Sequence, residues 1–195
     1  MERHRLKFYI GNMVLVKNTL SFLLIIPLGK VKQNNIGKKG FKMNLKKLQQ
    51  QIQLSLGNHP LSEVDYKRVE SELDIKLPET FKELNAVCSY EYCQFVSFFN
   101  FGSNLTESVI AATLGVRDRF ANSDNNIVLY LDEAGIILLD ATSIEGTVIW
   151  CSIYDLENYF SKEKMQYEYK IFPTFSDFFQ FLLDEEEKSR EEDMK

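Results

Sequence analysis

Apolar positions after Met43 first recur at helical spacing and later alternate or cluster in short runs. In the segment NLKKLQQQIQLSLG, Leu45, Leu48 and Ile52 have near-helical spacing, and Gly57 follows where a left-handed cap costs little. This pattern predicts a short first helix that buries one apolar face.

Two further helices are indicated by the residues that would start them. Ser62 and Asp65 form a capping-box pattern, and Val69 and Leu73 continue the apolar face of the second helix. Pro78 lies where a third helix would begin, because the missing amide proton of proline costs nothing in a first turn. The first half of the domain is therefore expected to be helical.

Strand signals follow the helical part. The aromatic run at 92–101 predicts a buried strand or strand pair, whereas 105–120 is ambiguous and is expected to be helical in part. The apolar runs 127–131 and 136–139 are joined by a tight DEAG connection and predict a β-hairpin. TVIWC at 147–151 predicts a third strand of the same sheet.

A closing helix is predicted near the C-terminus. Thr174 and Asp177 form a second capping pattern, and the apolar residues that follow have helical spacing: Phe175, Phe178, Phe179, Leu182 and Leu183. The continuation from 184 carries seven acidic residues without apolar periodicity. We expect it to fray, which divides the chain into a domain at 43–187 and an acidic tail at 188–195.

The order of these elements predicts an α+β fold, with N-terminal helices packed on a mainly antiparallel sheet and a closing C-terminal helix. This order resembles the SUKH family, the Smi/Knr-type domain. The segment 69–85 resembles the family signature of a glutamate on the second helix, a short turn, and Leu-Pro before the next helix. The matching positions are Glu70, Leu73, Leu77, Pro78, Phe81 and Leu84.

Two later segments carry the same resemblance. The segment 127–140 is similar to the family's central hairpin, with Asp140 at the position of its closing aspartate, and 172–183 is similar to its final Phe-x-x-Phe-Leu helix. The resemblance spans about 45–183 and none of 1–42. NAVCSYEYC at 85–93 replaces the glycine-rich turn that commonly follows the third helix in this family.

The resemblance implies a role in protein binding. Bacterial members resemble immunity proteins that neutralise secreted polymorphic toxins, frequently nucleases, and fungal relatives resemble regulatory scaffolds. We therefore expect a cytoplasmic bacterial immunity protein that binds a cognate toxin and blocks it by occlusion, without catalysis or a cofactor. A regulatory scaffold of the same fold is the alternative, and an enzyme that uses hairpin carboxylates is a distant third.

Charge is distributed unevenly along the chain. Residues 1–42 hold nine Lys or Arg and one acidic residue, which leaves 14 basic and 27 acidic residues in 43–195. The formal charge of that part is −13, against −5 for the whole chain. Such a surface repels phosphate backbones and favours a basic partner, so nucleic acid is not expected to bind directly.

The first 42 residues allow three interpretations. A basic start precedes apolar residues, as in signal peptides and membrane anchors. However, the longest uncharged stretch after Lys17 is only 18–29, a bilayer span needs about 20 residues, and no small-x-small cleavage signal follows. Lys39 and Gly40 can be encoded as AAAGGA shortly before the codon of Met43, which has the form of a ribosome-binding site.

We hypothesise that 1–42 are a translated leader and that the native protein starts at Met43. A membrane anchor and an authentic disordered extension are the alternatives. Binding to a membrane is expected only if 1–42 belong to the native protein.

Residue types that carry catalysis or bind metals are sparse. His59 is the single histidine of 43–195, and with Cys88 and Cys93 it would give only three zinc ligands at irregular spacing. Cys151 completes an odd set without CxxC spacing, which is typical of core thiols in a reducing compartment. No glycine-rich phosphate loop is present. We expect no metal site.

Acidic residues near the predicted hairpin and exposed aromatic residues are the candidates for partner binding, since several carboxylates together accelerate association with a basic protein. Acids in turns are also explained by turn geometry alone, and Glu70 by bracing of the turn before the third helix. The candidate partner-binding residues are Asp132, Glu133, Asp140, Glu145, Asp155, Glu157, Tyr90 and Tyr92.

Overall fold

A computed structural model describes residues 6–10, 13–17, 45–93, 96–101, 108–133 and 135–193. The chain divides into two units, 1–37 and 38–195. Within the first unit, β1 (Leu6–Ile10) and β2 (Met13–Lys17) form an antiparallel hairpin. The apolar stretch 18–29 and the hypothesised start at Met43 lie outside the described residues.

The second unit begins with the three predicted helices, α1 (Leu45–Leu56), α2 (Glu63–Leu73) and α3 (Glu79–Asn85). The capping box of α2 is formed as predicted. The amide of Asp65 donates to the Ser62 hydroxyl, and the amide of Ser62 donates to the Asp65 carboxylate, each at 3.2 Å. These two bonds satisfy amides that the first helical turn leaves without partners.

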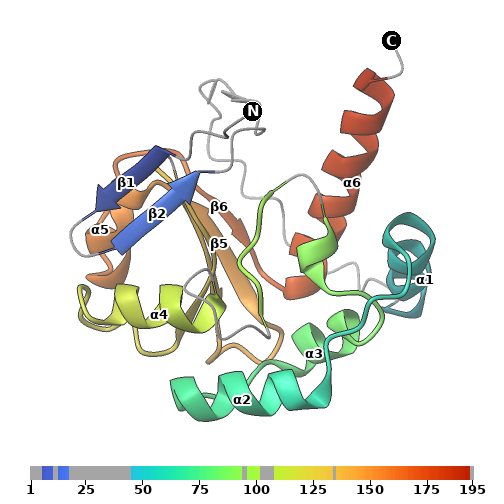
Figure 1. Ribbon diagram of the computed structural model, residues 1–195, viewed down its shortest axis with the longest axis horizontal. Coiled ribbons are helices and arrows are strands. Elements are labelled where there is room, and N and C mark those ends of the chain that lie inside the picture. The colour runs from blue at the N-terminus through green and yellow to red at the C-terminus, as the bar shows by residue number, and fades with distance from the viewer. Residues whose placement is uncertain are drawn as a thin grey trace. The chain divides into compact units, whose positions relative to one another are not determined.

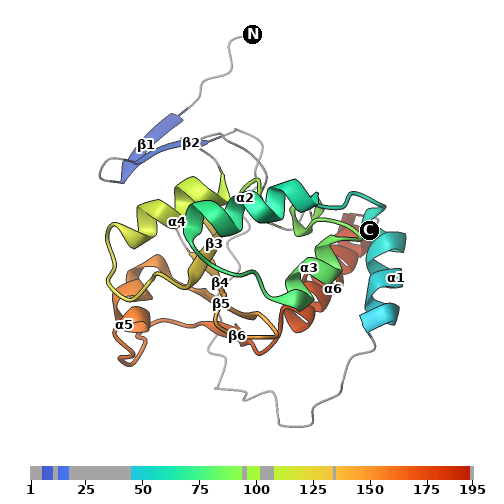
Figure 2. The same ribbon diagram turned by 90° about the horizontal axis from the view of Figure 1, so that it is seen from below.

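Four antiparallel strands form the sheet in the order β3, β4, β5, β6. Figure 1 labels β5 and β6, and Figure 2 labels all four strands. Their bounds are Asn126–Leu131, Ile136–Asp140, Thr147–Cys151 and Lys170–Phe172. The hairpin and the third strand confirm the sequence prediction, and the α+β fold class is confirmed. The short strand β6 is not among the predicted elements.

Helices cover both faces of the sheet. Val148 on β5 belongs to the larger core cluster, which includes α6 (Phe175–Asp193), whereas its neighbour Ile149 belongs to the smaller cluster. That smaller cluster packs against α4 (Val109–Arg117) and α5 (Leu156–Phe160). Figure 2 shows α4 and α5 on one side of the strands and α3 and α6 on the other.

The predicted strand at 92–101 is wrong for the described residues. The chain forms a short 3-10 helix, η1 (Tyr90–Tyr92), and 96–101 contain no strand. Phe101 is nevertheless fully buried, and its amide donates to the Glu91 carboxylate at 2.7 Å. Phe98, Phe99 and Phe101 contribute to the core from an irregular backbone, so the hydrophobicity of this run indicates burial rather than a strand.

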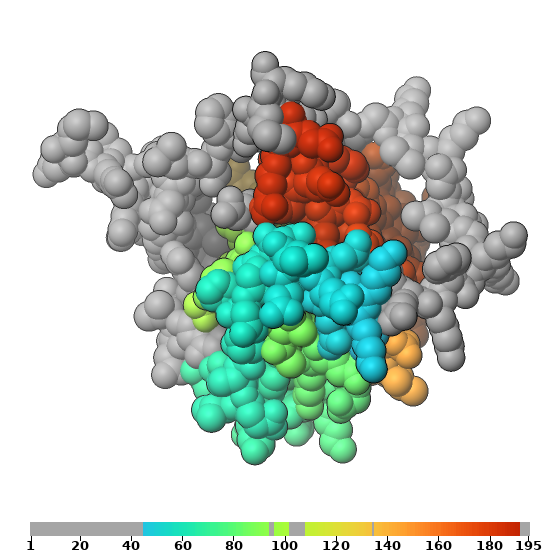
Figure 3. All heavy atoms as spheres, turned by 90° about the vertical axis from the view of Figure 1, so that its right-hand side faces the viewer, coloured from blue at the N-terminus to red at the C-terminus, as the bar shows by residue number. Residues whose placement is uncertain are grey.

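The prediction that the acidic C-terminal segment frays is also wrong, because α6 continues to Asp193. Side-chain pairs one turn apart support the extension: Lys188 contacts Glu185 at 2.6 Å and Arg190 contacts Glu186 at 3.6 Å. Arg190 also donates to the Ser55 carbonyl at 3.2 Å, which ties α6 to α1. Figure 3 shows α6 and α1 side by side on the surface.

Candidate partner-binding surface

The strand register separates the predicted carboxylates into two groups. Asp132 and Glu133 lie in the turn between β3 and β4, whereas Asp140 ends β4 and Glu145 lies in the next turn. A strand of five residues spans ~15 Å at about 3.3 Å per residue, so the two groups lie at opposite ends of the sheet. The two groups therefore cannot form one compact patch.

Asp132 and Asp140 shape their own turns. Asp132 accepts from the Gly135 amide at 2.8 Å and from the Tyr130 hydroxyl at 2.5 Å. Asp140 accepts from the amide of Thr142 at 2.9 Å and from its hydroxyl at 2.7 Å. These are the bonds that make aspartate favourable in turns. Both carboxylates therefore have a structural role in the hairpin.

Glu145 joins the second turn to two helices. Its carboxylate accepts from the Thr80 hydroxyl at 3.0 Å, and its carbonyl accepts from the Phe175 amide at 2.9 Å. The adjacent Gly146 has φ +72°, and a Cβ there would lie 3.2 Å from Leu139 and Phe175 and 3.3 Å from Pro78. This end of the sheet is a packed junction.

The prediction that Asp155 binds a partner is wrong, because its side chain is fully buried. Its carboxylate accepts from the amides of Gln166 and Tyr167, at 2.8 and 2.7 Å, and from Asn158 at 3.0 Å. Burial opposes ionisation, but these hydrogen bonds outweigh it and lower the pKa of Asp155. Asp155 thus holds the loop before β6 against the residues that follow β5.

The prediction that Tyr90 binds a partner is also wrong, because Tyr90 is fully buried. The rings around it are those of Phe81, Phe98, Phe101 and Phe175. Tyr92, two residues later, is 49% exposed. Its ring stacks on His59 at 4.1 Å between centroids. Tyr92 is therefore accessible, but it belongs to the helical side of the unit, beside the loop between α1 and α2.

The three cysteines are free and buried. Burial raises the pKa of Cys88 and of Cys93, and burial together with the charge of Asp155 raises the pKa of Cys151 to about 12. Thiols of this kind are poor nucleophiles at neutral pH, because the thiolate is the reactive form. Within the described ranges, no three His, Cys, Asp or Glu side chains lie together as metal ligands.

Exposed tyrosines gather at the end of the sheet where the turn between β3 and β4 lies. Tyr154, Tyr167 and Tyr169 are 74%, 52% and 41% exposed, and we call these three residues the tyrosine surface. Tyr154 follows β5 and Tyr169 precedes β6, while the rings of Tyr154 and Tyr167 lie 6.1 Å apart. The exposed Glu133 and Glu157 lie at the same end of the sheet.

The tyrosine surface is absent from the predicted set, although the sequence contains a signal for it. In YEYKI, Tyr167, Tyr169 and Ile171 recur at every second position, which is the spacing of one strand face. The polar residues between them make the segment look like a loop.

The residues of the family motif are structural. Glu70 accepts from the Leu77 amide at 2.8 Å and pairs with Lys82 at 2.8 Å. Partial burial raises the pKa of Glu70, but the contacts with Lys82 and Leu77 outweigh this and lower it. Glu70 therefore braces the turn before α3, as its structural interpretation predicts. The other motif residues are buried: Leu73, Leu77, Pro78, Phe81 and Leu84.

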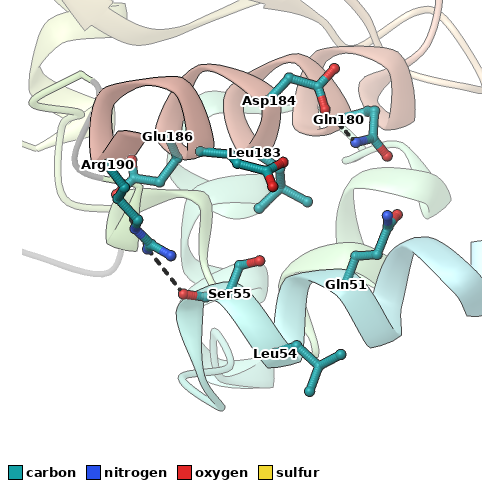
Figure 4. A pocket seen from close by; sticks show the side chains of 9 residues that line it. Gln51, Leu54, Ser55, Gln180, Leu183, Asp184, Glu186 and Arg190 are labelled. Carbon is teal, nitrogen blue, oxygen red and sulfur yellow. Dashed lines mark hydrogen bonds and ion pairs between the residues drawn. The ribbon is translucent and has the colours of Figure 1, made fainter. Parts of the chain in front are cut away.

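A shallow groove of about 270 Å³ lies between α1 and α6 (Figure 4). Arg190 reaches across it to Ser55, and Gln180 donates to Asp184 at 2.8 Å. The lining consists of amides, carboxylates, one hydroxyl, Arg190 and two leucines, without a histidine or a thiol.

No helix in the described part of the chain has both the length and the apolar character needed to cross a bilayer. Comparisons with protein-family models, with curated proteins and with solved structures find no match to this chain. The fold and the surface together define an α+β domain with exposed tyrosines at one end of its sheet.

Proposed function

We propose that this chain is an immunity protein of the SUKH type, which binds a cognate toxin protein and neutralises it by occlusion. The observation that carries the proposal is the tyrosine surface at one end of the sheet. The family resemblance of 45–183 supplies the kind of partner.

Tyrosine suits such a contact for physical reasons. It brings a large apolar ring and a polar tip with few rotatable bonds, and it is enriched among the residues that dominate binding energy. Tyr167 is also held in place before a partner arrives, because its amide donates to the buried Asp155. A contact surface that is already ordered loses less conformational entropy on binding.

The charge of the second unit favours a basic toxin. Residues 43–195 carry a formal charge of −13, and the exposed Glu133 and Glu157 lie at the same end of the sheet as the tyrosine surface. Carboxylates at the rim of an interface mainly increase the rate of association and select against acidic partners. A cytoplasmic location belongs to this proposal, and three free cysteines are compatible with a reducing compartment.

Co-expression tests this function. Where a toxin-like reading frame lies directly upstream of this chain's gene, cells that produce that toxin should stop growing, and the full chain supplied from a second promoter should restore growth. A chain that is folded by circular dichroism but fails to restore growth would contradict the proposal. A locus without a toxin-like reading frame upstream would favour the regulatory scaffold instead.

A further inference from the structure

Strand β6 leaves one edge of the sheet open. In the part of the chain that the structure describes, its three residues pair only with β5, through Val148 with Phe172, Ile149 with Ile171 and Trp150 with Lys170. No other backbone hydrogen bond reaches Lys170, Ile171 or Phe172 from the described residues. An open edge presents unpaired N–H and C=O groups that can pair with another extended segment.

The opposite edge of the sheet differs. There the amide of Phe99 donates to the carbonyl of Leu129 on β3 at 3.0 Å, so the segment before α4 covers part of that strand. In Figure 2 the strands follow one another from β3 to β6, and β6 forms the border. The two edges are thus unequal, and β6 is the accessible one among the described residues.

The side chains of β6 also favour a partner. Ile171 is 54% exposed, and Tyr169, two residues earlier, lies on the same face. A lysine on an edge strand usually protects against pairing. Here the Lys170 ammonium lies over the rings of Phe181 and Trp150, at 4.5 and 5.7 Å, and therefore over the other sheet face.

Charge decides between a second copy of the chain and a different protein. Two copies of the full chain would meet as like charges, each with a formal charge of −5 overall and −13 in residues 43–195. Like charges across an interface oppose association, whereas a basic segment is attracted. The edge is therefore better suited to a basic partner than to a second copy.

We propose that an extended basic segment of the toxin pairs with β6 and continues the sheet, a proposal that rests on the proposed function. Apolar side chains of that segment would pack on Tyr169 and Ile171, next to the rest of the tyrosine surface. In such strand addition the main chain supplies affinity and alternate side chains supply specificity.

Two matched variants test the proposal in the full-length chain. Ile171→Lys and Ile144→Lys add the same charge at exposed isoleucines, but Ile144, 83% exposed, lies in the turn at the other end of the sheet. The probe is a purified, inactivated domain of the toxin that the co-expression test identifies. Ile171→Lys should raise Kd at least about tenfold and Ile144→Lys by less than about twofold.

Hydrogen exchange of the wild-type complex gives a second readout that does not depend on how a variant folds. Pairing along β6 should slow exchange of at least one amide among Lys170, Ile171 and Phe172. A complex that forms without slower exchange at β6, or equal losses in the two variants, would overturn the edge proposal and leave the proposed function intact.

Two further outcomes separate the proposals. If the toxin domain does not bind the wild-type chain, both fail. If the chain alone sediments as a dimer that Ile171→Lys dissociates, the edge belongs to a second copy and the assignment to the toxin is overturned.

Discussion

At the scale of single residues, the buried Tyr90 and the partly buried Tyr130 differ in whether their hydroxyls have partners. The Tyr130 hydroxyl donates to Asp132, whereas the Tyr90 hydroxyl has no hydrogen-bond partner among the described residues. Burial and the charge of Glu91 raise the pKa of Tyr90 far above its usual value, so the hydroxyl stays protonated. A buried donor without a partner costs free energy.

Removing the two hydroxyls should therefore affect the free energy of unfolding differently. We expect Tyr90→Phe to leave the free energy of unfolding unchanged or raise it by up to about 1 kcal/mol, and Tyr130→Phe to lower it by about 1 kcal/mol. Denaturant unfolding of both variants measures this. A loss in Tyr90→Phe as large as that in Tyr130→Phe would mean that the Tyr90 hydroxyl has a partner.

Asp155 should act through its charge. The pKa of Asp155 is lowered in the folded state. Its charge therefore stabilises the fold above a pH of about 3.9, the ordinary pKa of aspartate, and this stabilisation is lost as the pH falls through the lower pKa of the folded state. The amide resonance of Tyr167 should consequently titrate with a midpoint below about 3.9. Asp155→Asn should abolish that titration and lower the free energy of unfolding by roughly 1–3 kcal/mol. A midpoint at or above the ordinary value would be inconsistent with this role.

At the scale of elements, α6 shows how pairing and packing extend a helix that its composition disfavours. Arg190 contacts Glu186 on the same helix and Ser55 on α1, whereas Lys188 pairs with the nearby Glu185 on its own helix. The last turns of α6 should therefore depend on Arg190 more than on Lys188.

Arg190→Ala should shorten the helix, with lower ellipticity at 222 nm and a loss of roughly 0.5–1 kcal/mol in unfolding free energy. Lys188→Ala is the control, and its thermal midpoint should match that of the wild type. Equal behaviour of the two variants would indicate that the contact with α1 contributes nothing.

The turn between β4 and β5 should tolerate no side chain at its glycine. Gly146 and Gly57 both have positive φ, +72° and +89°, but only Gly146 is enclosed by core atoms. Replacing either with alanine costs about 1 kcal/mol or more for the backbone, and Gly146→Ala should cost roughly 1–3 kcal/mol beyond Gly57→Ala because the core must shift. Thermal unfolding of the two variants compares them, and equal losses would contradict the close packing.

The sequence predicts those elements whose signals are local. Capping patterns and apolar periodicity locate α1, α2 and α6, and the DEAG connection locates the hairpin and hence the separation of Asp132 from Asp140. The strand β6 has only three residues, and the charged Glu168 and Lys170 interrupt the alternation that leads into it, so the segment also fits a loop. The burial of Tyr90 beside the exposed Tyr92 depends on distant aromatic rings, and no local pattern contains that information.

At the scale of the whole molecule, the two ends of the sheet have different roles. The end with Glu145 and Gly146 packs against α3 and α6, whereas the other end carries the tyrosine surface and adjoins the open edge β6. The exposed tyrosines Tyr154, Tyr167 and Tyr169 thus lie at the end of the sheet that is not packed against α3 and α6. The proposed toxin contact uses the tyrosine surface and the adjoining edge of β6.

The most direct test of the account is the affinity of the full chain for the inactive toxin domain, measured by titration calorimetry. The double variant Tyr154→Ala/Tyr167→Ala should raise Kd by about 100-fold or more, because both side chains belong to the tyrosine surface. Tyr92→Ala, an exposed tyrosine on the helical side, should change Kd by less than about twofold. Wild-type affinity in the double variant, or an equal loss in Tyr92→Ala, would contradict the account.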